Sequence, residues 1–210
     1  MHRVYPDSLG TARVPEVLQG RLHTHGLGHA KSLRCRKLAL AAGCRTREYG
    51  NTWDLMGHDG GNFQMMSAPL RASVGWTQAI VHGAGDATYT IAAATRPEGL
   101  PTAVQVRLPF AGNESMKLRQ PLALWIEYRA PFGFDSRMSR FENFAAGAMV
   151  NLTGSWQHGS GAKARSVDCP QRAPCLLDMT PETPGFGDAG LAVGRTWTEP
   201  FTGTRITVLS

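Results

Sequence analysis

Two histidines four residues apart, His25 and His29, restrict the fold and chemistry of this sequence more than any other feature. On an α-helix, residues four apart lie on the same side, so both imidazoles could bind one metal ion. Apolar residues around the pair recur at intervals of three and four, namely at Val14, Leu18, Leu22 and Leu33. This pattern predicts a helix that runs through both histidines and carries either a zinc site or two hydrogen-bonded core histidines.

Further motifs follow the histidine pair in a fixed order. They are Glu48-Tyr-Gly, Met56-Gly57, Asn62-Phe63, Ser67-Ala-Pro and Gly75-Trp76. Together with His25-x-Leu-Gly-His29, these motifs resemble the gametolysin-like family of zinc metallopeptidases, which belongs to the metzincins. The resemblance continues into residues 124–129, 133–135, 176–180 and 206–209, which look like the β-rich C-terminal part of bacterial relatives.

The resemblance implies a zinc-dependent endopeptidase. In that family a helix carries His-Glu-x-x-His, a glycine turns the chain three residues later, and a third histidine follows six residues after the second. A methionine turn lies under the metal. The resemblance therefore implies zinc as cofactor, His25 and His29 as ligands, Met56 as the Met-turn residue, and a protein or peptide substrate. It also implies a secreted or cell-surface protein.

The sequence departs from the family pattern at three positions. Gly26 stands where the catalytic glutamate is expected, and glycine has no side chain that could act as a base. Ser32 stands where the turn glycine is expected, and Cys35 stands where the third histidine is expected. We therefore assign no catalytic residue and expect the chain to lack peptidase activity.

Four cysteines fall into two close pairs, Cys35 with Cys44 and Cys169 with Cys175. Cys35 could be a thiolate ligand that completes a His25/His29/Cys35 zinc site. It could instead form a disulfide with Cys44, or be a small buried apolar residue. The second pair could close a loop as a disulfide in an exported protein.

The sequence after residue 85 predicts a different kind of structure. Short segments of alternating or continuous apolar residues are separated by glycine- and proline-rich turns. We expect strands at residues 89–92, 104–108, 122–128, 148–152, 175–179, 191–193 and 205–209. The predicted fold class is α+β: a metzincin-like remnant with active-site helix and Met-turn at residues 1–85, including a short helix at 68–74, and an antiparallel β-sandwich or jelly roll at residues 86–210.

Charge and hydropathy narrow the range of partners. The net charge of +6 comes largely from arginine, and a basic cluster lies at Arg34, Arg36, Lys37, Arg45 and Arg47. Such a cluster could meet phosphates or an acidic surface, but no aromatic residues interleave with it, so we expect a solvated loop and no nucleic-acid partner.

The sequence shows neither a signal-peptide pattern nor an apolar stretch long enough to span a membrane. The resemblance implies that an N-terminal part of a longer chain is missing.

Several other residues are weaker candidates. His58 could replace a zinc ligand, although a solvent-facing loop residue is the simpler interpretation. We expect Asp54 to hold backbone amides in the Met-turn. Trp125, Glu127, Tyr128 and Arg129 could bind a ligand or fill two faces of a central strand. Asp135, Asp178 and Asp188 could bind calcium, but turn residues are the simpler interpretation.

Two functions therefore compete at this point. The first is a zinc metallopeptidase of gametolysin type that is inactive as written because Gly26 replaces the catalytic glutamate. The second is a non-catalytic β-sandwich that serves as a binding or structural module.

Overall fold

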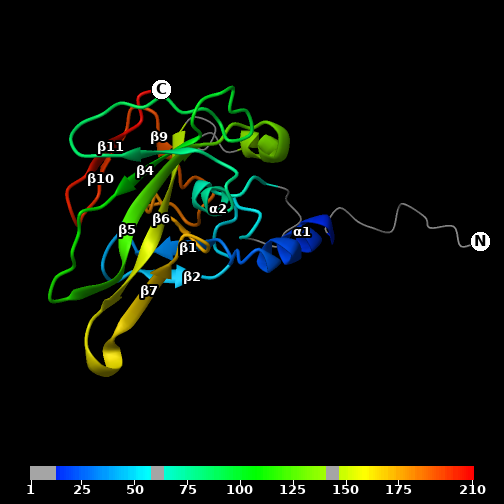
Figure 1. Cartoon of the computed structure of the whole chain (residues 1–210). Helices are drawn as coiled ribbons and strands as arrows, with labels where there is room; N and C mark the ends of the chain where they lie inside the picture. Colours follow the sequence, from blue (N-terminus) through cyan, green and yellow to red (C-terminus); the bar gives the residue numbers. More distant parts are fainter. Residues whose placement is uncertain (1–12, 58–63, 141–146) are drawn as a thin grey trace, which may run out of the picture.

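A computed structural model describes residues 13–57, 64–140 and 147–210 of the chain. The described residues form a mostly β structure, with a nine-stranded mixed sheet, a separate two-stranded sheet and two short α-helices (Figure 1). The elements are α1 Arg13–Thr24, β1 Lys31–Arg34, β2 Arg45–Arg47, α2 Ala68–Ser73, β3 Ala79–His82, β4 Ala103–Arg107, β5 Met116–Tyr128, η2 Gly133–Arg140, β6 Gly147–His158, η3 Gly161–Lys163, β7 Arg165–Cys169, β8 Cys175–Leu176, β9 Leu191–Ala192, β10 Thr196–Thr198 and β11 Arg205–Thr207.

Two long antiparallel strands, β5 and β6, form the centre of the large sheet. The strand order is β2-β1-β8-β6-β5-β4-β3, and β7 and β9 also pair with β6. Most pairs are antiparallel, whereas β1 with β8 and β3 with β4 are parallel. The β10–β11 hairpin forms the small sheet.

The central strands are buried on both faces of the sheet. Successive residues of a strand point to opposite faces, and in β6 the residues that point each way are buried. One face carries the main core, to which Leu124, Val150, Leu152 and Trp156 belong. The opposite face carries Trp125, Glu127 and Asn151 and packs against α2 and the segment that precedes it. This second face binds the start of α2 through Glu127, and Asp54 joins that start to Met56.

The predicted fold class is wrong. We expected a metzincin-like α+β remnant followed by a β-sandwich or jelly roll, but a single mixed sheet dominates the described residues. Strands on both sides of the predicted 85/86 boundary join this sheet, since β1 pairs with β8 and β3 pairs with β4. Pairings between segments this far apart in the sequence leave no local pattern from which to predict them.

The predicted helix through both histidines is also wrong. Helix α1 ends at Thr24, and Gly26 then adopts a left-handed backbone conformation with φ of 77°. His29 lies in the segment without regular structure that precedes β1. Leu33 fits the helical stripe by its spacing, but it is buried in the core by strand alternation instead.

Other elements agree better with the sequence. The predicted helix at 68–74 is confirmed as α2, and strands occur where we predicted them after residue 100, with shifted ends. The predicted strand at 89–92 is wrong, because that segment is irregular. Next to this segment, Ala93 forms only an isolated bridge with Tyr128, and the Ala92 N–H donates to the Pro101 carbonyl at 2.8 Å.

A buried ion pair joins α2 to the central strand β5. The Glu127 carboxylate accepts a hydrogen bond from Arg71 Nη1 at 3.0 Å, and its other oxygen accepts one from the Ala68 backbone N–H at 3.1 Å. Asn151 Nδ2 also donates to Glu127, at 3.2 Å. Because the Glu127 side chain is fully buried, these donors replace the water that a carboxylate would otherwise need.

A second buried pair lies two residues further along. Arg129 donates to both oxygens of Asp135, at 2.6 Å each, and also to the carbonyls of Trp53 and Met65. The nearby Asp135, Glu127 and Asp54 carboxylates raise the pKa of Arg129 despite the opposing effect of burial. The interpretation of Trp125, Glu127 and Tyr128 as residues of a central strand is confirmed. Arg129 directly follows that strand, and Asp135 is its ion-pair partner.

Replacing Arg71 with Met should lower the free energy of unfolding by about 3–5 kcal/mol, because Glu127 would keep a buried charge without its cation. The double variant Arg71→Met/Glu127→Gln should recover part of that loss. Urea unfolding followed by circular dichroism measures both. The exposed Arg96–Glu98 pair provides the control, since Arg96→Met should change stability little. Equal effects of Arg71→Met and Arg96→Met would contradict this prediction.

Candidate metal site

The imidazole of His23, in the last turn of α1, meets the imidazole of His29. The Nε2 atoms of these histidines lie 3.1 Å apart, and the rings meet edge to face. His29 Nδ1 lies 2.7 Å from Glu48 Oε1, and His23 Nδ1 lies 2.7 Å from the carbonyl oxygen of Leu27. Each ring is therefore fixed through one nitrogen and presents the other to its neighbour.

The hydrogen-bond partners decide which nitrogen carries the proton. A backbone carbonyl and a carboxylate can only accept, so Nδ1 of each histidine must donate. In neutral imidazoles, both Nε2 atoms then hold lone pairs that point toward one another. Two lone pairs at 3.1 Å repel unless a proton or a cation lies between them. A proton or a metal cation between the two Nε2 atoms would remove this repulsion.

A helix C-cap turn places His23 opposite His29. The Gly26 N–H donates to the His23 carbonyl at 2.9 Å, and the Leu27 N–H donates to the Leu22 carbonyl at 3.2 Å. These two bonds and the left-handed Gly26 make up a Schellman motif. Leu22 and Leu27 are both buried in one small core with Met56, so the turn is anchored by apolar contacts.

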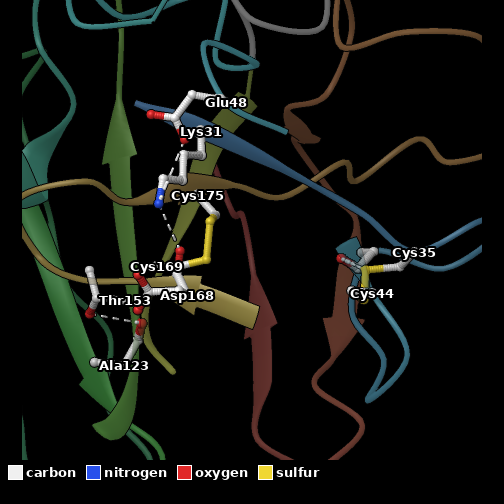
Figure 2. Close-up of a disulfide and its surroundings, with 10 residues drawn as sticks. Lys31, Cys35, Cys44, Glu48, Ala123, Thr153, Asp168, Cys169 and Cys175 are labelled. Atoms are coloured by element: carbon white, nitrogen blue, oxygen red, sulfur yellow. Dashed lines mark hydrogen bonds and ion pairs between the residues drawn. A yellow bond between two sulfur atoms is a disulfide. The ribbon is translucent and has the colours of Figure 1, made fainter. Parts of the chain in front are cut away.

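The loop between β7 and β8 holds the segment between the two histidines. Arg172 Nη1 donates to the His25 carbonyl at 2.6 Å, and the Gly28 N–H donates to the Arg172 carbonyl at 2.6 Å. The Lys31 N–H donates to the Pro174 carbonyl at 2.8 Å. A disulfide between Cys169 and Cys175 closes this loop (Figure 2). The loop acts as a rigid support for residues 25–31.

Glu48, which fixes His29, is itself held in place. Lys31 Nζ lies 3.8 Å from Glu48 Oε2 and donates to the Asp168 carbonyl at 3.2 Å, so it links the residue that follows β2 to β7 (Figure 2). The Tyr49 ring stacks on the His29 imidazole, with centroids 3.7 Å apart. Tyr49 has a φ of 54°, a conformation that a bulky residue adopts only under constraint.

The structure brings together only part of the predicted ligand set. His29 is in the pair, but its partner is His23 and not His25, whose residue is exposed beyond the helix end. Cys35 forms a disulfide with Cys44, which was one of the alternatives left open (Figure 2). Its sulfur is therefore not a thiolate in this structure, and thiolate is the form that binds zinc.

Met56 is fully buried beneath this region. It packs with Leu22, Leu27, Met66 and Leu70, and its carbonyl accepts a hydrogen bond from the Ala30 N–H at 2.7 Å. The predicted Met-turn residue thus lies directly beside the residue that follows His29. His58 and Asn62-Phe63 lie outside the described residues.

Asp54 braces the backbone around Met56, as predicted. Its two carboxylate oxygens accept hydrogen bonds from the Met56 N–H at 2.8 Å and the Ser67 N–H at 2.6 Å. Burial raises the pKa of the Asp54 carboxyl, while the hydrogen bonds from Ser67 and Met56 and the charge of Arg129 oppose that rise. This residue joins the Met56 segment to the start of α2.

Sequence reasoning missed His23, although a signal for it was present. Gly26 follows His23 by three residues and His29 follows it by six, which is the spacing of the second histidine, the turn glycine and the third histidine in the gametolysin-like pattern. The left-handed conformation of Gly26 is what that turn requires. Choosing the four-residue pair His25/His29 shifted the register of the whole motif.

The other predicted metal ligands do not gather. Asp178 accepts from the Thr180 N–H and Asp188 accepts from the Thr183 hydroxyl, as turn residues do. Partial burial raises the pKa of Asp178, and the charges of Asp188 and Glu182 add to this effect. Within the ranges that the structure describes, no group of three or more His, Cys, Asp or Glu side chains could hold a metal ion.

An open cleft of about 570 Å³ lies next to the supporting loop. Its walls are Ser73, Gln120 and residues 170–172, so Arg172 borders both the cleft and the turn at His25.

No helix among the described residues is long and apolar enough to span a membrane. Comparison with protein-family models, curated proteins and solved structures gives no match in any of the three.

Replacing Gly26 with Ala should lower the free energy of unfolding by about 1–2 kcal/mol, because a residue with a Cβ is strained in the left-handed region. The new Cβ would also lie 2.7 Å from Arg172 Nη1. Gly20→Ala provides the control, because Gly20 lies inside α1 with open space around it. That change should raise the free energy of unfolding by about 0.5–1 kcal/mol. Thermal unfolding measures both, and a neutral or stabilising Gly26→Ala would contradict the assignment of the turn.

Proposed function

We propose that this chain is a divalent-metal-binding, non-hydrolytic relative of the gametolysin-like zinc metallopeptidases. His23 and His29 would hold the metal, and zinc is the ion that the family resemblance implies. The observation that carries the proposal is the 3.1 Å separation of two Nε2 atoms whose rings each donate the Nδ1 proton to an oxygen acceptor.

This arrangement fits a metal in two respects. Zinc binds imidazole nitrogen at about 2.0–2.1 Å, so two nitrogens that share one ion must lie close together, as these do. Histidines that bind metals usually donate the second ring N–H to a carboxylate or a backbone carbonyl. Glu48 and the Leu27 carbonyl are acceptors of these two kinds.

The remaining positions of the pattern explain why we expect binding without peptide hydrolysis. With His23 as the second histidine, the first histidine corresponds to Gln19 and the catalytic glutamate to Gly20. Gln19 lies one helical turn before His23, on the same side of α1, and an amide oxygen is a weak ligand for zinc. In the family, bound zinc supplies Lewis-acid chemistry at the scissile carbonyl. Gly20 has no carboxylate to move the proton.

The cysteines bear on where the protein acts. Both pairs form disulfides, which is compatible with an extracellular protein. Together with the family resemblance, they support the proposal that the protein is secreted or held at the cell surface, where its partners would be proteins or peptides.

Protein dialysed against a weak chelator and titrated with Zn²⁺ should bind about one ion per chain at the paired histidines. His23→Ala and His29→Ala should each abolish this binding, because a single imidazole would remain. His25→Ala is the matched control and should keep it, since the structure leaves the His25 side chain outside the pair. Isothermal titration calorimetry measures the stoichiometry. Loss of binding in His25→Ala with retention in His23→Ala would overturn the assignment.

Glu48→Gln should weaken Zn²⁺ binding by about 10–100-fold, the usual effect of removing a carboxylate that orients a ligating histidine. Glu98→Gln is the control, because Glu98 is an exposed carboxylate paired with Arg96 in another part of the chain. Competition with a chromophoric zinc chelator measures both affinities. An unchanged affinity in Glu48→Gln would show that Glu48 does not orient His29 for metal.

A further inference from the structure

Three arginines share one face of the β1–β2 hairpin. In the antiparallel register, Arg34 lies directly opposite Arg45, and Ser32 lies opposite Arg47. Directly opposed residues point to the same face, and so do residues two apart on one strand. Arg34, Arg45 and Arg47 therefore project together, and all three are exposed. The other face of the hairpin carries Leu33, which belongs to the main core.

A disulfide fixes this arrangement. Cys35 follows Arg34 and Cys44 precedes Arg45, so the Cys35–Cys44 bond joins the two strands right after the opposed arginines, with Cα atoms 4.3 Å apart (Figure 2). The loop that it closes carries two more exposed cations, Arg36 and Lys37. Arg36 has a φ of 62°, which sets its backbone in a turn.

These five cations have no countercharge in the described structure. None lies within ion-pair distance of a described carboxylate, and the nearest acid in sequence, Glu48, is engaged by His29 and Lys31. Like charges directly opposite in an antiparallel pair are destabilising. The Cys35–Cys44 disulfide therefore holds Arg34 and Arg45 opposite each other despite their repulsion, and a bound anion would reduce that repulsion.

We propose that the face formed by Arg34, Arg45 and Arg47, with Arg36 and Lys37 beside it, binds an anionic polysaccharide through its sulfate or carboxylate groups. Guanidinium groups pair with such oxyanions through two parallel hydrogen bonds. Opposed arginines have Cα atoms about 4.5–5.5 Å apart, and Arg45 and Arg47 are about 6.7 Å apart along the strand. This array suits a polymer with closely repeated charges better than a single small anion.

Two observations favour a polysaccharide over a nucleic acid. Single-stranded nucleic acids are normally held by aromatic side chains on which bases stack, and this face has none. Tyr49, the exposed aromatic residue nearest in sequence, is stacked on His29. The two disulfides are also compatible with the extracellular space, where acidic polysaccharides occur.

The test is salt elution of the purified full chain from immobilised heparin, a sulfated polysaccharide. The variant Arg34→Ala/Arg45→Ala/Arg47→Ala should elute at clearly lower salt than the wild type. A matched variant, Arg107→Ala/Arg195→Ala/Arg205→Ala, removes the same charge from exposed positions on β4 and around the β10–β11 hairpin, and should elute close to the wild type. Circular dichroism confirms that both variants are folded.

Three results would overturn the proposal. Equal shifts in both variants would mean that heparin senses only net charge. Elution of the wild type at the salt of an uncharged control column would mean that the face does not bind the polymer. Tighter binding to an oligonucleotide than to heparin, lost in the first variant alone, would assign the face to nucleic acid instead.

Discussion

Two buried carboxylate–guanidinium pairs hold the region before and within α2 onto the sheet. Glu127 of β5 binds Arg71, and Arg129, which directly follows β5, binds Asp135. Through Arg129, the sheet also binds the carbonyls of Trp53 and Met65, so segments without regular structure gain fixed positions. Removing one partner of such a pair costs several kcal/mol, because the other charge stays buried. The position of Met56, and hence of the turn above it, depends on these contacts.

The histidine pair depends in turn on a packed C-cap. Leu22 and Leu27 join Met56 in one core, and this fixes the end of α1 against the segment that leads to His29. Arg172 and its disulfide-closed loop hold the other side of the same segment. Contacts within the chain therefore hold the two imidazoles together, and such fixed positions would suit the metal ion proposed for this pair.

The two disulfides have different local roles. Cys169–Cys175 stiffens the loop that carries Arg172 and so supports the histidines. Cys35–Cys44 joins two strands whose arginines repel each other and keeps a cationic surface in register. Both cross-links lie near the β1–β2 hairpin, so the metal site proposed at His23 and His29 and the cationic face proposed on the hairpin share one rigid scaffold.

The sequence by itself determined the local features: the short helix at Ala68–Ser73, most strands after residue 100, and the bracing role of Asp54. Each of these depends on residues close together in the chain. Tertiary structure alone decided that β1 and β3 join the later strands in one sheet, because those pairings are long-range and carry no periodic signal. It also decided that His23, and not His25, meets His29. The sequence allows a four-residue pair, His25 with His29, and a six-residue pair, His23 with His29. The left-handed turn at Gly26, next to Arg172, selects the second.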